Sequence, residues 1–367
     1  MTFETALHDP KLCRVLLARL TRALDGRSMR FMEVCGTHTV SIFQSGLRSL
    51  LPASITHLSG PGCPVCVTHD VDVAAFLELA GREKIVFATF GDLLRVPGPG
   101  GQTLKHAKAA GAHVEIVYSP LEVLTLAVSN PDNVIVFPGI GFETTAPAVA
   151  ATLLTARQKK IKNFCVFSLH KLVPPALRTL LDEEGDNAAN IEAFLLPGHV
   201  STILGIAPYA FLADKHRIPG VVGGFEPADI LLALCRMAEQ LRDNAPAVVN
   251  AYPRAVNDAG NPKARALMEE VFITTDALWR GIGRIERSGL AVRPDYADMD
   301  AAVRLGVRLV ETPQQQPGCC CGDVLKGRII PTTCPLFGEK CTPAVPVGPC
   351  MVSTEGSCAA YYKYSEH

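Results

Sequence analysis

The stretch that most constrains this chain is Gly60-Pro61-Gly62-Cys63-Pro64-Val65-Cys66. It follows a short apolar run, Ile55–Leu58, and precedes a helical pattern that starts near Asp70. The C-x-x-C pair is therefore predicted to lie on a strand-to-helix turn, where glycines permit a tight bend. The N–H groups at a helix start favour the thiolate, which attacks disulfides and binds metals. Two buried structural cysteines are the alternative, but this spacing on such a turn favours redox or metal chemistry.

The composition restricts the class of protein. A chain of 367 residues, 48% of them hydrophobic, can build two or three domains with sizeable cores. The formal net charge is −1 and no basic stripe stands out, so a nucleic-acid partner is not expected. Charged residues such as Asp9, Lys11 and Arg14 interrupt the first apolar pattern, which predicts an amphipathic helix rather than a signal peptide. We therefore expect a cytoplasmic protein, whose clustered thiols serve metal rather than disulfides.

One stretch of the sequence could be taken for a membrane span. Ala193–Ala213 contains no Asp, Glu, Lys or Arg and is long enough to span a bilayer. However, Pro197-Gly198 and Pro208 interrupt it. A buried strand, a turn and a buried helix fit this pattern better, so no membrane association is expected.

The alternation of short apolar runs with helical patterns predicts an α/β fold built from parallel βαβ units. The pattern restarts near Asn133, and two turns, Gly141–Glu143 and Gly224–Glu226, share the sequence Gly-Phe-Glu. These features suggest two similar parallel-sheet α/β lobes that face a cleft. We expect lobe I over residues 28–130 and lobe II over 131–280, with part of the C-terminal helices of lobe II packing on lobe I.

Polar side chains follow many of the predicted strands. In parallel sheets every strand-to-helix turn lies at the C-terminal edge, where ligands bind. If two lobes face each other, the groups on these turns converge on one cleft. The candidate residues are Cys35, His38, Cys63, Cys66, Asp92, Glu143, His199 and Glu226.

These candidates differ in how strongly they point to chemistry. Cys35 and His38, three residues apart at a helix start, suit iron or zinc, or a nucleophile with its base; a buried cysteine with a capping loop is the alternative. His199 and His170 each end an apolar strand, where hydrogen-bonded structural histidines are more common. Glu143, Glu226 and Asp92 are explained equally well as helix caps.

The C-terminal part of the chain is unusually rich in cysteine. So short a stretch with few large apolar side chains builds little core, so metal or disulfides must hold it. The paired C-x-x-C knuckles of zinc sites do not occur there, and thiolates from scattered loops suit an iron–sulfur cluster. A disulfide-stapled tail is the alternative. The seven cysteines are Cys319, Cys320, Cys321, Cys334, Cys341, Cys350 and Cys358.

Several ordered motifs resemble the HypD family, which matures [NiFe]-hydrogenases, and the likeness runs along most of the chain. The matching motifs are CGTHT at Cys35–Thr39, GPGCPVC at Gly60–Cys66, GFETTAP at Gly141–Pro147, PGHVS at Pro197–Ser201, GFEP at Gly224–Pro227, and the tail from Cys319 with PTTCPLFGEKCTP and GPCMVSTEGSC.

The resemblance implies two α/β lobes and a third domain, formed by residues 1–27 with 281–367, that holds a [4Fe-4S] cluster. The family's C-x14-C-x6-C-x16-C pattern falls on Cys319, Cys334, Cys341 and Cys358, with Cys320 between two motif positions. Cys321 and Cys350 then remain as a neighbouring thiol pair able to form a disulfide, an arrangement similar to ferredoxin–thioredoxin reductase.

The resemblance also implies a function. HypD proteins act with a HypC-like small chaperone to hold the iron on which the Fe(CN)2CO group is built. A HypE-like protein donates cyanide, and the hydrogenase large subunit receives the product. Carried over to this chain, Cys35 is the ligand of a transient mononuclear iron that carries CN and CO, and His38 is a nearby ligand or orienting group. Cys63 and Cys66 form a redox dithiol. Such a protein is a metallocentre-assembly scaffold rather than a conventional turnover enzyme.

Two other functions fit parts of the sequence. In a thiol–disulfide oxidoreductase like ferredoxin–thioredoxin reductase, Cys63 and Cys66 would reduce a protein substrate and no iron centre would be built. In a zinc-stabilised binding protein, the cysteine-rich tail would hold zinc and no sulfide.

Overall fold

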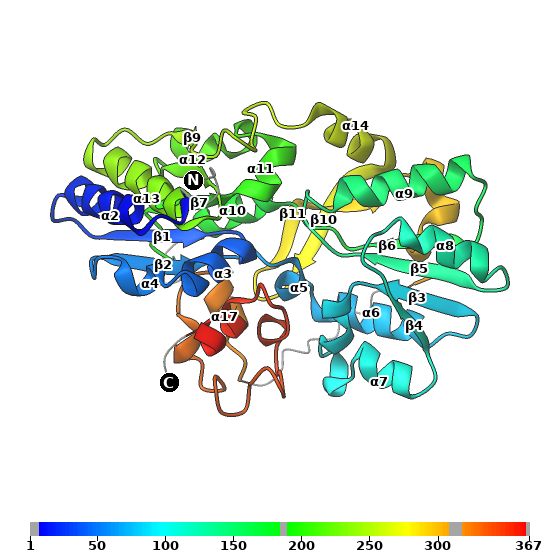
Figure 1. Cartoon of the computed structure of the whole chain (residues 1–367). Coiled ribbons are helices and arrows are strands. Elements are labelled where there is room, and N and C mark those ends of the chain that lie inside the picture. Colours follow the sequence, from blue (N-terminus) through cyan, green and yellow to red (C-terminus); the bar gives the residue numbers. More distant parts are fainter. Residues whose placement is uncertain (1–6, 184–188, 308–317, 365–367) are drawn as a thin grey trace.

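Two parallel β-sheets form the frame of the protein (Figure 1). The computed structural model describes residues 7–183, 189–307 and 318–364. One sheet has the strand order β2-β1-β7-β8-β9 and the other β4-β3-β5-β6, and neighbouring strands are parallel in both. The predicted α/β class with parallel-sheet lobes is confirmed. The strands of these sheets are β1 (Met29–Glu33), β2 (Ile55–Ser59), β3 (Ile85–Thr89), β4 (His113–Ile116), β5 (Val134–Gly139), β6 (Phe164–Ser168), β7 (Ala193–Pro197), β8 (Gly220–Gly223) and β9 (Val248–Asn250).

The chain leaves one lobe and later returns to it. Strands β1 and β2 belong to the five-stranded lobe, β3 to β6 form the four-stranded lobe, and β7 to β9 complete the first sheet. The sheets therefore do not divide at residue 130: β5 pairs with β3, and β7 pairs with β1. Sequence periodicity locates strands, but parallel strands pair across crossovers of any length, so it does not say which strands are neighbours.

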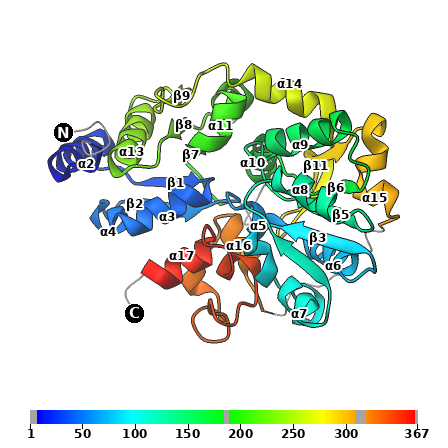
Figure 2. The ribbon, with the colours of Figure 1, turned by 45° about the vertical axis from the view of Figure 1, so that its right-hand side comes forward.

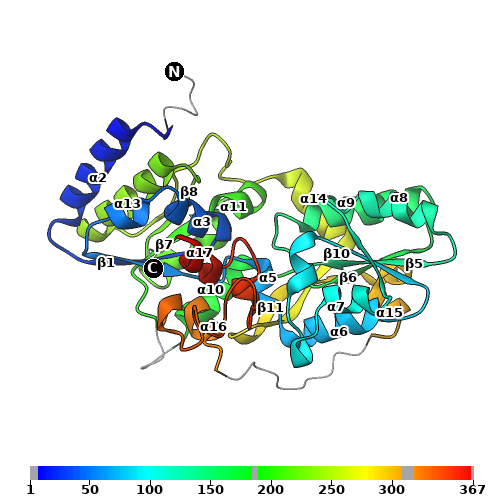
Figure 3. The ribbon, with the colours of Figure 1, turned by 60° about the horizontal axis from the view of Figure 1, so that its bottom comes forward.

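The first helix packs on the five-stranded lobe. Helix α2 (Pro10–Leu24) is capped by Asp9, whose carboxylate accepts the N–H of Lys11. Its buried Leu20 lies in one apolar cluster with Leu234 of α13 (Pro227–Arg242). The sequence predicted that residues 1–27 group with the C-terminal cysteines, whereas α2 lies beside α13 (Figure 3) and shares an apolar cluster with it. The other helices of this lobe are α3 (Gly36–Gln44), α4 (Leu47–Leu50), α11 (Gly198–Leu204) and α12 (Phe211–Asp214).

The uncharged stretch Ala193–Ala213 forms several short elements of this lobe instead of one long helix. These are the buried strand β7, helix α11, the short 3-10 turn η4 (Ala207–Tyr209) and the start of α12, as the interrupted pattern predicts. No helix in the described part of the chain combines the length and the apolar character needed to cross a membrane.

An antiparallel hairpin extends the four-stranded lobe past the predicted boundary at residue 281. Strands β10 (Phe272–Trp279) and β11 (Gly283–Val292) flank that boundary and pack on this lobe, so it falls on their turn. The helices around this lobe are α5 (Pro64–Val67), α6 (Asp70–Ala80), η1 (Gly91–Arg95), η2 (Pro99–Gly101), α7 (Leu104–Ala109), α8 (Glu122–Ser129), α9 (Ala146–Gln158), α10 (Val173–Leu181), α14 (Pro262–Val271), η5 (Pro294–Met299) and α15 (Ala301–Arg304).

The cysteine-rich segment, residues 318–364, lies beneath α3 and beside α5 (Figure 2). Its last helix packs on α3, where the rings of Phe43 and Tyr361 are 4.6 Å apart between centroids. This contact places the segment under the C-terminal edges of strands β1 and β2. Its helices are α16 (Cys321–Leu325), η6 (Pro331–Thr333), η7 (Pro349–Met351) and α17 (Ser357–Tyr364).

Candidate metal and thiol centre

Cys35 lies on the turn between β1 and α3, as the N-cap residue of that helix. Burial raises the pKa of its thiol, the carboxylates of Glu355 and Glu33 raise it further, and the backbone N–H groups of His38 and Thr37 oppose them, with a net value of about 12. Cys35 is therefore a neutral thiol at physiological pH. A bound cation would reverse this balance, because metal coordination deprotonates a thiol.

Glu33 holds the Cys35 turn in place. Its carboxylate is buried at the end of β1 and accepts the backbone N–H of Cys35 at 3.0 Å and the hydroxyl of Thr39 at 2.5 Å. We did not predict this residue from the sequence. The available signal was an acidic side chain at the end of an apolar strand, two residues before a candidate ligand.

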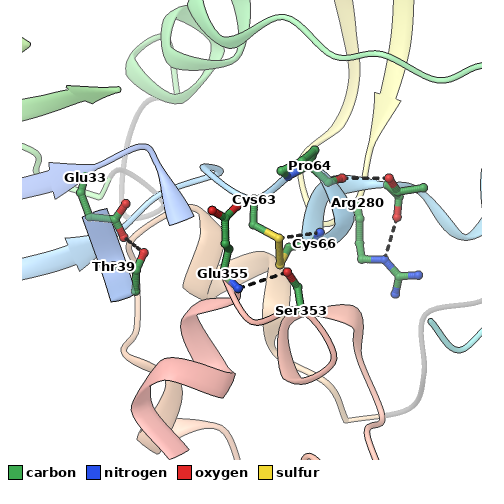
Figure 4. The surroundings of a disulfide bond; sticks show 9 residues. Glu33, Thr39, Cys63, Pro64, Cys66, Arg280, Ser353 and Glu355 are labelled. Atoms are coloured by element: carbon green, nitrogen blue, oxygen red, sulfur yellow. Dashed lines mark hydrogen bonds between the residues drawn. A yellow bond between two sulfur atoms is a disulfide. The ribbon is translucent and has the colours of Figure 1, made fainter. Parts of the chain in front are cut away.

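The C-x-x-C turn packs directly on the Cys35 turn. The N–H of Gly36 donates to the carbonyl oxygen of Gly62 at 3.0 Å. A Cβ atom on Gly62 would lie 2.2 Å from the backbone nitrogen of Cys35, so only glycine permits this approach. Cys63 and Cys66 are joined by a disulfide, and the Cys66 N–H donates to the Cys63 sulfur at 3.2 Å (Figure 4). Three sulfur atoms are thus carried by two turns in backbone contact.

A pocket of about 400 Å³ opens beside these turns, between the two lobes. It brings together Cys35 and His199, two of the predicted cleft residues. Glu355 of the cysteine-rich segment also lines it and accepts the hydroxyl of Thr37 at 2.7 Å. No sequence signal links a residue in this aperiodic tail to the Cys35 turn. The four-stranded lobe contributes Phe142, Thr144 and Thr145, and the five-stranded lobe adds Val200, Thr202 and Ile203.

The His38 ring points away from this pocket. It is fully buried, its Nε2–H donates to the carbonyl of Gly224 at 3.0 Å, and burial lowers its pKa to about 4. Phe225 lies between this neutral imidazole and His199, with ring centroids 4.7 and 4.1 Å away. His38 is not among the described residues that line the pocket; it contacts Cys35 through its backbone N–H.

Two predicted cleft residues, Glu226 and Asp92, lie away from this pocket. Glu226 precedes α13, where its N–H donates to Asp229 at 3.3 Å and its carboxylate pairs with His8. This position agrees with the alternative interpretation of Glu226 as a helix cap. Asp92 lies on η1 of the four-stranded lobe. Neither is among the described residues that line the pocket beside Cys35.

Glu143 is buried behind the pocket wall. One oxygen, Oε1, accepts the N–H of Val173 at 2.9 Å, and Oε2 has no hydrogen-bond partner within the described residues. Burial raises the pKa of this carboxyl to about 8. It borders a second cavity of about 280 Å³. His170 is also buried, which lowers its pKa to about 3.

All seven cysteines of the C-terminal segment line one small apolar cavity of about 20 Å³. Their sulfurs contact one another: Cys319 lies beside Cys321, and Cys350 beside Cys358. In both pairs the neighbouring thiol raises the pKa more than burial does. Cys321 and Cys350 are not bonded to each other here, and both are free thiols.

This donor set fits an iron–sulfur cluster, because it offers only sulfur ligands around an apolar space. Among the described residues, no three Cys, His, Asp or Glu side chains are already gathered as a formed metal centre.

Comparison with known proteins identifies the family. The HypD family, described as "Hydrogenase formation hypA family", matches residues 11–365. The hydrogenase maturation factor HypD of Rhodobacter capsulatus is 42% identical, covering 99% of this chain and 98% of the relative. HypD of Rhizobium leguminosarum bv. viciae is 41% identical over 99% of this chain and 96% of the relative. HypD of Escherichia coli is 45% identical over 93% and 90%. The chain therefore belongs to the HypD family of hydrogenase maturation factors.

Proposed function

We propose that this protein is the scaffold on which the Fe(CN)2CO group of a [NiFe]-hydrogenase is assembled in the cytoplasm, together with HypC-like and HypE-like partners. One observation carries the proposal: Cys35 and the Cys63–Cys66 pair lie on two packed turns, and both turns contribute to the lining of a pocket between the lobes. Cys35 itself lines this pocket, and the redox-active pair lies on the neighbouring turn.

The iron is cargo in this proposal, and Cys35 is its anchor. The carboxylates of Glu33 and Glu355 raise the pKa of the Cys35 thiol in the protein alone. The same negative charges attract a cation, which takes the place of the thiol proton. The hydrogen bond from Thr37 fixes the Glu355 carboxylate at the pocket wall. His38 orients the turn through its backbone N–H and its bond to Gly224.

Cyanide release from a thiocyanate donor consumes two electrons, which a dithiol at Cys63 and Cys66 can supply. The S–CN bond of the donor breaks, the donor sulfur leaves as a thiol, and cyanide passes to the iron. Cys63 and Cys66 lose two hydrogen atoms in total and form their disulfide, so one proton goes to the donor thiol and one to solvent. In this proposal the Cys63–Cys66 disulfide is the spent form of the pair.

The disulfide must then be reduced again. In our proposal Cys319, Cys334, Cys341 and Cys358 hold a [4Fe-4S] cluster, and Cys321 and Cys350 form an intermediate thiol pair. When bound, the cluster supplies electrons one at a time. The protein's part is to hold the cysteine-rich segment against α5: η7, which carries Cys350, packs on α5, which carries Cys66.

Infrared spectroscopy tests the scaffold function. The protein is isolated without oxygen together with its HypC-like partner, and the region of metal-bound CN and CO stretches is recorded. We expect bands that disappear in Cys35→Ala, because the iron loses its anchoring thiolate. Cys165→Ala is the matched control, since Cys165 is another buried free cysteine but lies in the core at β6.

The same experiment separates the second candidate function. A cluster-containing complex without these bands would contradict the scaffold and favour a thiol–disulfide oxidoreductase, which the existing Cys63–Cys66 disulfide also suits. Bands that persist unchanged in Cys35→Ala would remove Cys35 as the iron ligand.

A further inference from the structure

Arg280 anchors the segment that directly follows the C-x-x-C turn. It comes after β10, and its backbone N–H donates to the carbonyl of Val67 at 2.9 Å. Its side-chain Nε–H donates to the carbonyl of Thr68 at 3.0 Å, and its guanidinium pairs with Asp70. The residue is only 6% exposed. The end of α5, which carries Cys66, is therefore fixed by one arginine from the distant β10–β11 hairpin (Figure 4).

The next residue fixes the same hairpin to the cysteine-rich segment. A Cβ atom on Gly281 would lie 2.3 Å from the Cα atom of Gly322, so the two backbones are in direct contact. Gly322 is the second residue of α16, directly after Cys321. Residues 280 and 281 thus join the C-x-x-C turn on one side to the cysteine cluster on the other.

The charge of Arg280 also lies beside the cysteine-rich segment. Arg280 is buried, and the backbone of the adjoining Gly281 contacts Gly322, the residue that follows Cys321. An arginine keeps this charge at every physiological pH. Asp70 offsets part of it from the side of α6.

We propose that Arg280 is a positioning residue for electron delivery: it holds the C-x-x-C turn against the cysteine cluster, and its charge makes the cluster easier to reduce. This inference rests on the function proposed above for the cluster and the dithiol. A cluster bound by four thiolates is negatively charged and gains a further negative charge on reduction. A fixed nearby cation therefore stabilises the reduced state more than the oxidised state.

The electron transfer that Arg280 is proposed to support has a defined balance. Reduction of the Cys63–Cys66 disulfide takes two electrons and two protons. The cluster passes the electrons in two successive one-electron steps, each following its own reduction by an external low-potential one-electron donor. The contacts of Arg280 hold the groups between which these electrons move, and its charge adds to the driving force of both steps.

The test uses the cluster-containing full-length protein and compares Arg280→Gln, Arg280→Lys and the double variant Arg280→Gln/Asp70→Asn. The double variant removes both partners of the buried ion pair, so that no unpaired buried charge destabilises the fold. Arg287→Gln is the control, because Arg287 lies exposed on the same hairpin. Two quantities are measured: the cluster midpoint potential, by redox titration followed by electron paramagnetic resonance, and the reduction of Cys63–Cys66 by the dithionite-reduced cluster, by thiol alkylation and mass spectrometry.

We expect a more negative midpoint potential in Arg280→Gln and in the double variant, and a loss of at least about tenfold in the rate of disulfide reduction by the cluster. Arg280→Lys should restore the potential, because it restores the charge, and Arg287→Gln should resemble the wild type. Dithiothreitol, which bypasses the cluster, should reduce the disulfide equally in all variants.

Different results would contradict the inference about Arg280 and the proposed function. An unchanged potential and rate in folded, cluster-containing variants would overturn the inference about Arg280 and leave the proposed function intact. A wild-type protein that binds no cluster under iron and sulfide reconstitution would contradict the proposed function, and the inference would fall with it.

Discussion

Gly62→Ala is expected to abolish iron–cyanide loading and to destabilise the protein by about 3 kcal/mol, as overpacking of a tight core contact does. The added methyl group would lie 2.2 Å from the backbone nitrogen of Cys35 and 2.5 Å from the carbonyl carbon of Val34. Both atoms belong to the backbone and have no rotamer by which to move away. The Cys35 turn and the C-x-x-C turn must therefore separate.

Infrared bands of the loaded complex and chemical unfolding of the protein alone measure the two effects. Gly81→Ala is the matched control, because a Cβ there would make only an ordinary contact at 3.6 Å with its own helix end. Wild-type loading and stability in Gly62→Ala would show that the two turns do not need their backbone contact.

Glu143→Gln is expected to change how stability depends on pH. Burial raises the pKa of Glu143 to about 8 from an ordinary value of 4.5. Between these values the folded protein keeps the carboxyl proton while the unfolded chain releases it. The contribution of Glu143 therefore lowers the free energy of unfolding as pH rises through this window, by up to about 5 kcal/mol, and is constant above it.

Glutamine cannot ionise, so the variant should lack this decline and be more stable than the wild type near pH 8. Its amide oxygen can still accept the Val173 N–H. Denaturant unfolding at several pH values between 5 and 9 measures the difference. Glu286→Gln, at an exposed position of β11, should keep the wild-type slope. Parallel pH profiles for Glu143→Gln and the wild type would contradict the assignment of a neutral buried carboxyl.

Local sequence rules were sufficient to predict each turn, but not the residues that pack against it. The glycine-rich C-x-x-C motif and the Cys35 motif both lie on strand-to-helix turns as predicted, because short-range sterics and helix capping decide such turns. The rule that ligands gather at the C-terminal edges of parallel strands predicted a shared cleft, and Cys35 and His199 both line one pocket.

The same rule failed where tertiary packing decides the outcome. Glu143 and Glu226 both follow Gly-Phe at a strand end, but one carboxylate is buried against α10 and the other caps α13 at the surface. The contribution of Glu355 to the pocket could not be predicted, because the tail around it has no periodicity and its contact with residue 36 spans most of the chain. The helix at residues 10–24 was evident from the sequence, but its packing partner was not. An apolar stripe shows that one face of a helix is buried, but it does not identify the element that buries it.

The return of the chain to its first sheet affects the order in which the protein forms on the ribosome. Strands β3 to β6 are consecutive, so the four-stranded sheet can close once residue 168 has emerged, whereas the five-stranded sheet waits for β7 to β9. Cys35, Cys63 and Cys66 are synthesised early, but the pocket wall that carries His199 is added only afterwards. During this interval the three thiols are exposed to solvent without this wall. The speed of translation between residues 66 and 355, where Glu355 completes the pocket, therefore sets how long they can meet stray metal ions or oxidants.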